Sequence, residues 1–378
     1  KWHLGDAEEF LPTRHGFDEY IGIPYSNDMD WNVNGITFDK LISRPDLYEE
    51  YAKISSVITE QIFNPNVKDW NVPLLRSIKM SDGYTDEVLE RPADQELITK
   101  KYTEYSINFL EQSVKNNKPF FLFLSHSMPH VPLFRSKDFV NKSKLGIYGD
   151  VIEEIDWSVG EIIKILKKNK IENNTIVVFT SDNGPWLLFK THGGSAGPLR
   201  AGKGTTFEGG QRVPAVFWGP GIVKPGVINE IGSTLDLLNT FASLSGGKTP
   251  TDRKMDSYDL SKVLCERAES PRKEFFYWAF AELHGYRTNQ YKIHIKQREP
   301  INYSSPTIIL DKPELYDLRA DISEKYDVAE IFPNEVSKML KTMSLHLEDI
   351  EGSRPEQLSH VIEGTNSTDG FRDKGRGF

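Results

Sequence analysis

The sequence contains a single cysteine, Cys265, among its 378 residues. One cysteine cannot form an internal disulfide, so no disulfide framework supports the fold. The neighbouring Val263 and Leu264 indicate a helix face, and this context favours a half-buried structural thiol over a catalytic nucleophile.

Long apolar runs and an excess of positive charge are also absent. No run approaches the roughly 20 apolar residues that a membrane-spanning helix needs, so no membrane span is predicted. A net charge of −9, from 46 basic and 55 acidic residues, argues against a nucleic-acid partner. A few focused cationic side chains can still bind an anionic substrate on an acidic protein.

The apolar residues that are present alternate between helical and strand-like patterns. Helical spacing occurs at 44–60, 94–117 and 148–168. Continuous apolar runs occur at 118–127, 175–180 and 213–221. Helix, buried strand and polar loop in alternation predict an α/β fold, in which helices cover both faces of a largely parallel central sheet.

The pattern changes after about residue 250. Short strand-like runs lie at 273–280, 286–296 and 306–311, and a helical pattern lies at 334–349. They predict a smaller subdomain made of an antiparallel sheet and one helix. We therefore expect the main α/β domain at residues 1–250, the antiparallel subdomain at 251–351 and a surface tail at 352–378.

A carboxylate and an amide follow the run that ends at Thr180. Asp182 and Asn183 are hard oxygen donors, and Gly184 with Pro185 turns the chain directly after them. Ligands of α/β sheets bind at the carboxyl ends of strands, so the pair suits Ca²⁺, with Mg²⁺ as the alternative. An Asx turn that merely closes the strand is equally compatible with the pattern.

Two histidines, His126 and His130, follow the apolar run at 118–127. Pro129 and Pro132 predict an extended, shaped loop rather than a helix. A histidine in this position can donate a hydrogen bond to an oxyanion or a proton to a leaving group. The structural alternative is a histidine that only closes the end of a strand.

A glycine-rich segment holds seven glycines between residues 193 and 210, together with Arg200 and Lys203. Glycine lets the backbone approach a ligand closely, and lysine presents a point charge to an anion. The phosphate-loop pattern fails because Gly204 follows Lys203 where Ser or Thr is required. The alternative is a flexible surface loop. Together, the three clusters suit an oxyanion such as sulfate, phosphate or phosphonate.

These stretches, in this order, resemble the arylsulfatase-type members of the sulfatase family. The matching segments are KWHLG, FLPTRHGFDEYIGIPYSND, SHSMPHVPLF, TIVVFTSDNGPW and GGSAGPLRAGKGTTFEGGQRVP. The resemblance extends to about residue 350. It implies the alkaline-phosphatase-like fold with a smaller C-terminal subdomain, and hydrolysis of sulfate esters of small molecules or carbohydrates.

The resemblance also implies roles for single residues. Asp182 and Asn183 match calcium ligands of the family. Lys203 matches the lysine that contacts both the sulfate and the nucleophile. His130 matches the histidine that binds sulfate and assists the leaving group.

Residues near the start of the chain match further site residues of the family. Lys1 corresponds to a sulfate-binding lysine, and His3 to a histidine that hydrogen-bonds the nucleophile. Ser26 corresponds to a serine near the sulfate in some members. His192 has no firm counterpart, but it precedes the glycine-rich segment and is expected to contact substrate.

The sequence departs from the family at the nucleophile, which is a formylglycine made from Cys or Ser in a C/S-x-P-x-R segment. No such segment occurs, and Cys265 in CERAE lacks both the Pro and the Arg. The two aspartates that complete the calcium site, which precede KWHLG in the family, are absent too. We therefore expect that the chain is part of a longer protein, with the nucleophile and two metal ligands upstream of Lys1, and is inactive by itself.

Two alternatives are a non-catalytic, sulfatase-like binding protein and a metal-dependent phosphodiesterase or phosphonate hydrolase. The presence of Lys1, His3, His130 and Lys203 favours an enzyme over the first alternative. The segment GKGTTFEGG favours a sulfatase over the second. By resemblance, the expected location is the periplasm, the lysosome or the cell exterior.

Overall fold

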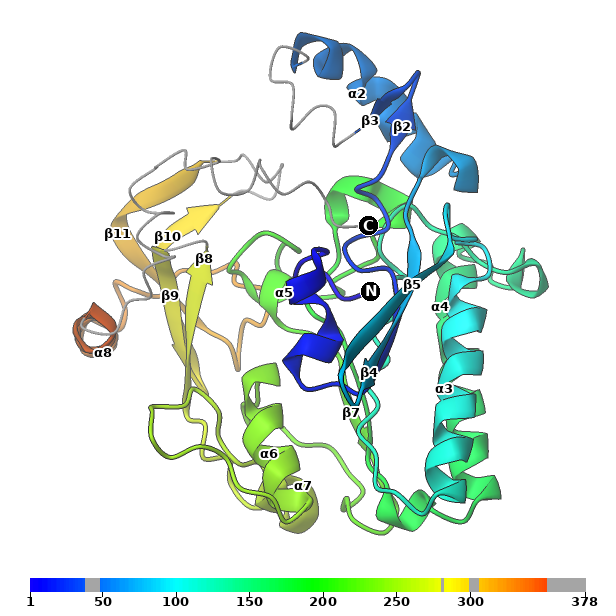
Figure 1. The fold of residues 1–378 in the computed structure, drawn as a ribbon. Helices are drawn as coiled ribbons and strands as arrows, with labels where there is room; N and C mark the ends of the chain where they lie inside the picture. Colours follow the sequence, from blue (N-terminus) through cyan, green and yellow to red (C-terminus); the bar gives the residue numbers. More distant parts are fainter. Residues whose placement is uncertain (38–47, 280–281, 299–305, 352–378) are drawn as a thin grey trace. The chain divides into compact units, whose positions relative to one another are not determined.

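The computed structural model describes residues 1–37, 48–279, 282–298 and 306–351 (Figure 1). Contacts divide the described residues into two units: those within 1–170 and 191–193 form the first, and those within 171–190 and 194–351 form the second. The predicted tail at 352–378 lies outside the described residues.

The first unit contains a three-stranded antiparallel sheet in the order β1-β4-β5. Its strands are β1 (Glu19–Gly22), β4 (Leu74–Met80) and β5 (Gly83–Glu90). Gly22 pairs with Leu75, so β1 ends beside the buried start of β4 and leads directly into residues 23–28. A short hairpin of β2 (Asn32–Val33) and β3 (Ile36–Thr37) follows.

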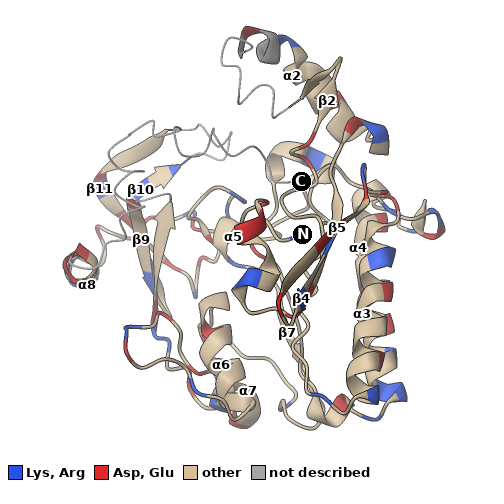
Figure 2. Cartoon of the chain, viewed as in Figure 1, with Lys and Arg blue, Asp and Glu red and all other residues tan. Residues whose placement is uncertain are grey.

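Two long helices, α3 (Ile98–Lys115) and α4 (Gly146–Lys168), pack against one another in this unit (Figure 1). They confirm the helices predicted at 94–117 and 148–168. The inward positions of α3 are buried at helical spacing, and Thr103 donates a hydrogen bond to Ser158 of α4 at 2.6 Å. Charges of both signs lie on these helices (Figure 2).

The remaining helices of the first unit are shorter or only partly described. Helix α2 (Tyr48–Phe63) agrees with the prediction at 44–60, of which 44–47 lie outside the described residues. Single 3₁₀ turns lie at η1 (Glu8–Phe10), η2 (Pro12–His15), η4 (Val67–Asp69) and η5 (Lys137–Phe139). None of the described helices of the chain combines the length and the hydropathy that a bilayer crossing requires.

The strand predicted at 118–127 is wrong, because these residues form no strand and pair with none of the described strands. Phe121 and Phe123 are 60% and 59% exposed rather than buried. The end of the segment is instead held by Lys1: its backbone nitrogen donates to the carbonyl of Ser125, and Ser125 Oγ donates back to the Lys1 carbonyl at 2.7 Å.

The second unit contains two antiparallel sheets. Strands β6 (Val177–Thr180) and β7 (Ala215–Trp218) pair with each other and match two of the predicted apolar runs. The larger sheet has the order β11-β10-β9-β8. Its strands are β8 (Glu274–Ala279), β9 (Glu282–Thr288), β10 (Tyr291–Arg298) and β11 (Thr307–Asp317).

Helix α8 (Pro333–Glu351) packs on the four-stranded sheet and confirms the predicted sheet-plus-helix subdomain. The shared core consists of Leu283, Tyr286, Ile293, Leu315, Met339 and Met343. Shorter elements of this unit are α5 (Glu208–Gln211), α6 (Leu237–Leu244), α7 (Ser261–Glu266), η6 (Glu172–Asn174) and η8 (Thr234–Asp236), while η7 (Leu187–His192) runs from the second unit into the first.

Every ladder among the described strands is antiparallel. The α/β class is as predicted, but the parallel pairings of the expected central sheet do not occur between these strands. The run at 118–127 was expected to contribute to that sheet. Because it forms no ladder, β6 pairs with β7 alone.

Cys265 lies on α7 and is partly buried, as predicted for a structural thiol. Burial raises the pKa of its thiol, and the nearby Glu266 and Asp259 raise it further. A thiol with a raised pKa holds little thiolate near neutral pH, so it is a poor nucleophile.

Candidate active site

The first unit brings three of the predicted site residues together around a fourth residue, Asp28. Two backbone hydrogen bonds align the start of the chain with the segment after β1: Trp2 N donates to Ile23 O at 3.0 Å, and His3 N donates to Pro24 O at 3.1 Å. This alignment carries Lys1 to Ser26, where Lys1 Nζ lies 3.4 Å from Ser26 Oγ.

Asp28 links the serine to the predicted catalytic histidine. Ser26 Oγ donates a hydrogen bond to Asp28 Oδ1 at 2.5 Å. The same oxygen lies 4.0 Å from His130 Nδ1, which is also 2.6 Å from the carbonyl oxygen of Val131. An amine, a hydroxyl, a carboxylate and an imidazole therefore meet in one cluster, which we call the Lys1 cluster (Lys1, Ser26, Asp28 and His130).

The fully buried Asn27 holds the histidine loop in place. Its Nδ2 lies 3.4 Å from the carbonyl oxygens of His130 and Val131 and 3.3 Å from that of Pro132. Asn27 and Asp28 were not predicted as site residues. Both directly follow Ser26 in the segment PYSND. Three consecutive polar residues at this point were the sequence feature that could have indicated a site.

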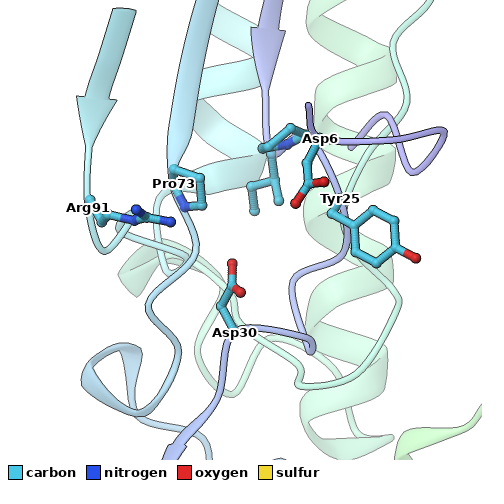
Figure 3. Close-up of a pocket in the computed structure, with 7 residues that line it drawn as sticks. Asp6, Tyr25, Asp30, Pro73 and Arg91 are labelled. Carbon is cyan, nitrogen blue, oxygen red and sulfur yellow. The ribbon is translucent and has the colours of Figure 1, made fainter. Parts of the chain in front are cut away.

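His3 lies beside the Lys1 cluster and is placed by Tyr25. Its backbone is left-handed, with φ 62°, and its exposed ring packs edge-on against the Tyr25 ring with centroids 4.7 Å apart. Tyr25 also borders a small cavity, which Figure 3 shows with Asp6, Asp30 and Arg91 around it. Charged groups of both signs therefore line the cavity that Tyr25 borders.

Two further histidines of the first unit, the buried His192 and the partly buried His126, are not part of the Lys1 cluster. His192 packs on Phe63, with ring centroids 5.0 Å apart, and burial lowers its pKa. His126 lies 3.3 Å from Ser158 Oγ, and burial lowers its pKa to about 4. The His126 imidazole is therefore neutral near pH 7. The contact with Phe63 ties His192 to the end of α2 rather than to the Lys1 cluster.

The second unit brings Asp182, Asn183 and Lys203 together through two tightly packed loops. Gly184 N donates to Gly210 O at 3.0 Å, and Lys203 N donates to Pro185 O at 2.9 Å. A Cβ atom at Gly184 would lie 1.8 Å from the Gly209 carbonyl oxygen. Glycine is thus required where the SDNG loop meets the glycine-rich segment.

Trp186 orients the side chain of Lys203. The ammonium nitrogen lies 4.6 Å from the centroid of the Trp186 ring, and Trp186 packs edge-on against Phe189. A cation over an aromatic face is attracted by the ring's quadrupole. The glycine-rich segment is therefore ordered, which contradicts the alternative of a flexible surface loop.

Asp182 and Asn183 fit a hard metal ion in donor chemistry. The Asp182 carboxylate is exposed, and the Asn183 amide donates through Nδ2 to the Gly184 carbonyl oxygen at 2.9 Å, so its oxygen is still an acceptor. Calcium takes six to eight oxygen ligands. Within the described ranges, no group of three or more His, Cys, Asp or Glu side chains could hold a metal. The pair therefore fits part of a calcium site.

The predicted site residues thus form two groups. Lys1, His3, Ser26 and His130 lie in the first unit, and His192 lies in that unit against Phe63 of α2. Asp182, Asn183 and Lys203 lie in the second unit.

Comparison with known proteins identifies the class of protein that carries these two groups. The family model described as Sulfatase matches residues 2–247, and the model described as the C-terminal region of aryl-sulfatase matches residues 270–368. The chain belongs to the sulfatase family, which confirms the resemblance and the fold class.

Individual relatives agree with this assignment. N-acetylgalactosamine-6-sulfatase of Mus musculus is 34% identical over 298 residues, which cover 78% of this chain and 51% of that protein. Arylsulfatase A of Homo sapiens is 32% identical over 385 residues, which cover 96% of this chain and 71% of that protein. The chain thus spans about half the length of the first relative.

Solved structures of sulfatases share the fold. The PsFucS1 sulfatase from Pseudoalteromonas sp. matches with a TM-score of 0.78 at 25% identity, covering 93% of this chain and 69% of that one. Ps i-CgsB, solved in complex with k-i-k-neocarrahexaose, matches with a TM-score of 0.67 at 26% identity, covering 99% and 77%.

Proposed function

We propose that the complete protein is a sulfatase that hydrolyses sulfate monoesters. The observation that carries this proposal is the Lys1 cluster, in which an amine, a hydroxyl and an imidazole converge in a member of the sulfatase family. These are the groups that can bind an anionic ester and release its alcohol.

In this proposal, the Lys1 ammonium and the Ser26 hydroxyl donate hydrogen bonds to the nonbridging oxygens of the sulfate. Such charge-assisted hydrogen bonds are short and strong, and they strengthen as charge grows in the transition state. His130 donates a proton to the oxygen of the departing alcohol. Asp28 Oδ1 lies 4.0 Å from Nδ1 of the imidazole that this step uses.

Lys203, in the glycine-rich segment, would also bind sulfate through its ammonium, which is held over Trp186. Asp182 and Asn183 would hold Ca²⁺, which when bound adds positive charge beside the sulfate oxygens. The nucleophile in this proposal is a formylglycine upstream of Lys1, because no C/S-x-P-x-R segment occurs in the sequence.

We infer that the substrates are sulfated sugars. The relatives include N-acetylgalactosamine-6-sulfatases, and Ps i-CgsB was solved with a neocarrahexaose. The small cavity beside Tyr25 has room for only a single hydroxyl-sized group, and Asp6, Asp30 and Arg91 line it (Figure 3). Carboxylates accept hydrogen bonds from sugar hydroxyls, and guanidinium donates to them.

Sulfate release by the complete protein tests the proposed function. Substrates are p-nitrophenyl sulfate and N-acetylgalactosamine 6-sulfate, with bis(p-nitrophenyl) phosphate alongside. We expect sulfate release from both esters, a loss of at least a hundredfold in kcat for Lys203→Ala, and no change for the exposed Lys248→Ala. Hydrolysis of the phosphate diester alone, or tight binding of the sulfated sugar without turnover, would refute the proposal.

A further inference from the structure

A buried network of charges joins the loop of Lys203 to the four-stranded sheet of the same unit. Glu208 lies five residues after Lys203, at the start of α5, and its side chain is almost fully buried. Its Oε2 accepts a hydrogen bond from Arg287 at 2.6 Å. Its Oε1 accepts from Tyr277 at 2.7 Å and from Lys292 at 3.1 Å.

The carboxylate of Glu208 is charged despite its burial. Burial alone raises its pKa, but the positive charges of Lys292 and Arg287 outweigh that effect and lower the pKa to about 2. A buried carboxylate with two cationic partners cannot leave its position without exposing unpaired charge to the protein interior.

A second buried carboxylate, that of Glu324, fixes the segment from Lys203 to Glu208 by bonding to the backbone of that segment. Glu324 Oε2 accepts a hydrogen bond from Glu208 N at 2.7 Å, and its Oε1 lies 3.0 Å from both Lys292 Nζ and His294 Nε2. Lys292, between the two carboxylates, is 0% exposed. Strand β10 thus supplies the cation that both carboxylates share.

The other end of the segment is anchored by Arg200. Its Nη1 donates to the carbonyl of Glu324 at 2.7 Å and to Tyr316 Oη at 3.2 Å, and its guanidinium lies 4.0 Å from the centroid of the Phe207 ring. Gly209 N donates to Arg200 O at 2.8 Å and closes the loop. Residues 200–209 are therefore held at both ends, with Lys203 between the anchors.

We propose that Lys292 and Glu324 are positioning residues for Lys203, so that the C-terminal sheet sets the place of the lysine that contacts sulfate. The inference rests on the proposed function for the role of Lys203. Its structural part, the anchoring of residues 200–209 by β10 and Glu324, is independent of that function. The network is buried and touches no substrate, so it acts only through the loop.

Paired variants of the complete protein test this proposal. Lys292→Met and Glu324→Gln each break the network. Lys296→Met is the control: Lys296 lies on the same strand as Lys292, but it pairs with Glu282 at 2.8 Å, outside the network. The first two variants should lower kcat at least tenfold, change KM less than threefold and speed hydrogen exchange of residues 199–211. Lys296→Met should leave all three quantities unchanged.

A double variant separates positioning from stability. Glu208→Gln with Lys292→Met removes one carboxylate and the cation together, so it should recover most of the melting temperature that Lys292→Met loses. Activity should stay low, because the loop is still unanchored. Recovery of activity together with stability would overturn the proposal.

Hydrogen exchange distinguishes the failure of this inference from that of the proposed function. Without sulfate hydrolysis by the wild type, faster exchange at 199–211 in Lys292→Met still supports the anchoring. Unchanged exchange in both network variants would overturn the inference, whatever the activity.

Discussion

At the residue scale, one oxygen of Asp28 serves two neighbours: it accepts the Ser26 hydroxyl proton and lies 4.0 Å from His130. This carboxylate brings net negative charge into a cluster that is proposed to bind an anion. The Lys1 ammonium, 3.4 Å from the Ser26 hydroxyl, brings a positive charge to the same cluster.

The proposed proton donor can be tested through the leaving group. His130→Ala should lower kcat for a sulfated sugar by about 10²–10⁴, because a sugar alkoxide leaves poorly without a proton. The same variant should lose much less with p-nitrophenyl sulfate, whose leaving group is stable as an anion. Equal losses for the two substrates would contradict a role as general acid.

Asp28→Asn keeps the size of the side chain and removes its charge. We expect kcat to fall about tenfold, which corresponds to about 1.4 kcal/mol of transition-state stabilisation, while KM changes little. Asp18→Asn, an exposed aspartate of the same unit, is the matched control. Steady-state kinetics of both variants gives the comparison, and equal rates for wild type and Asp28→Asn would rule out the assigned role.

The sequence predicted Lys1, Ser26 and His130 as site residues, and the structure places them together. The sequence could not predict the partner residues that position these three side chains. Asn27 reaches carbonyl groups 103 to 105 residues away in the chain, and no local pattern encodes such a contact. The placement of His192 against Phe63 likewise depends on tertiary packing.

At the element scale, periodic helices were predicted well and the buried strand was not. Helices α3, α4 and α8 carry their own signal, because apolar positions recur along one face. The run at 118–127 is apolar enough for a strand, but a strand also needs a hydrogen-bonded neighbour. Residues 119–124 find none among the described strands.

Glycine substitutions test the packing between the SDNG loop and the glycine-rich segment. Gly184→Ala should destabilise the protein by about 1–3 kcal/mol and lower activity, because its Cβ would meet the Gly209 carbonyl oxygen. Gly160→Ala is the control: it lies in α4 with no atom near the added Cβ, and should stabilise by about 0.5–1 kcal/mol. Thermal unfolding measures both, and a stable, active Gly184→Ala would contradict the described packing.

At the scale of the whole molecule, titrating groups determine how stability depends on pH. Burial lowers the pKa of His126 and of His284 from 6.5 to about 4. Both residues fold as neutral imidazoles, so their contribution is complete above pH 6.5 and is lost as the pH falls towards 4. Glu208 has a folded pKa of about 2, so its contribution is lost only between about pH 4.5 and 2.

The free energy of unfolding should therefore decrease in two stages on acidification. His284→Gln should flatten the first stage, between pH 6.5 and 4, because glutamine does not titrate. Urea unfolding at closely spaced pH values measures the slope in each stage. A slope in the first stage that is identical in wild type and variant would show that His284 is not responsible.

The location of the protein outside the cell or in the lysosome, which the sequence resemblance implied, stays a prediction.

The buried network around Lys292 also affects how the protein can be divided. The two family models meet between residues 247 and 270, near the domain boundary predicted at 250. Glu208 lies on one side of that boundary, and Lys292 and Glu324 lie on the other. A segment that began at 251 would lose one of the two carboxylates that neutralise a fully buried ammonium. The boundary visible in the sequence is therefore a poor place to cut the chain for expression, and an exchange of C-terminal regions between relatives would have to carry both sides of the network.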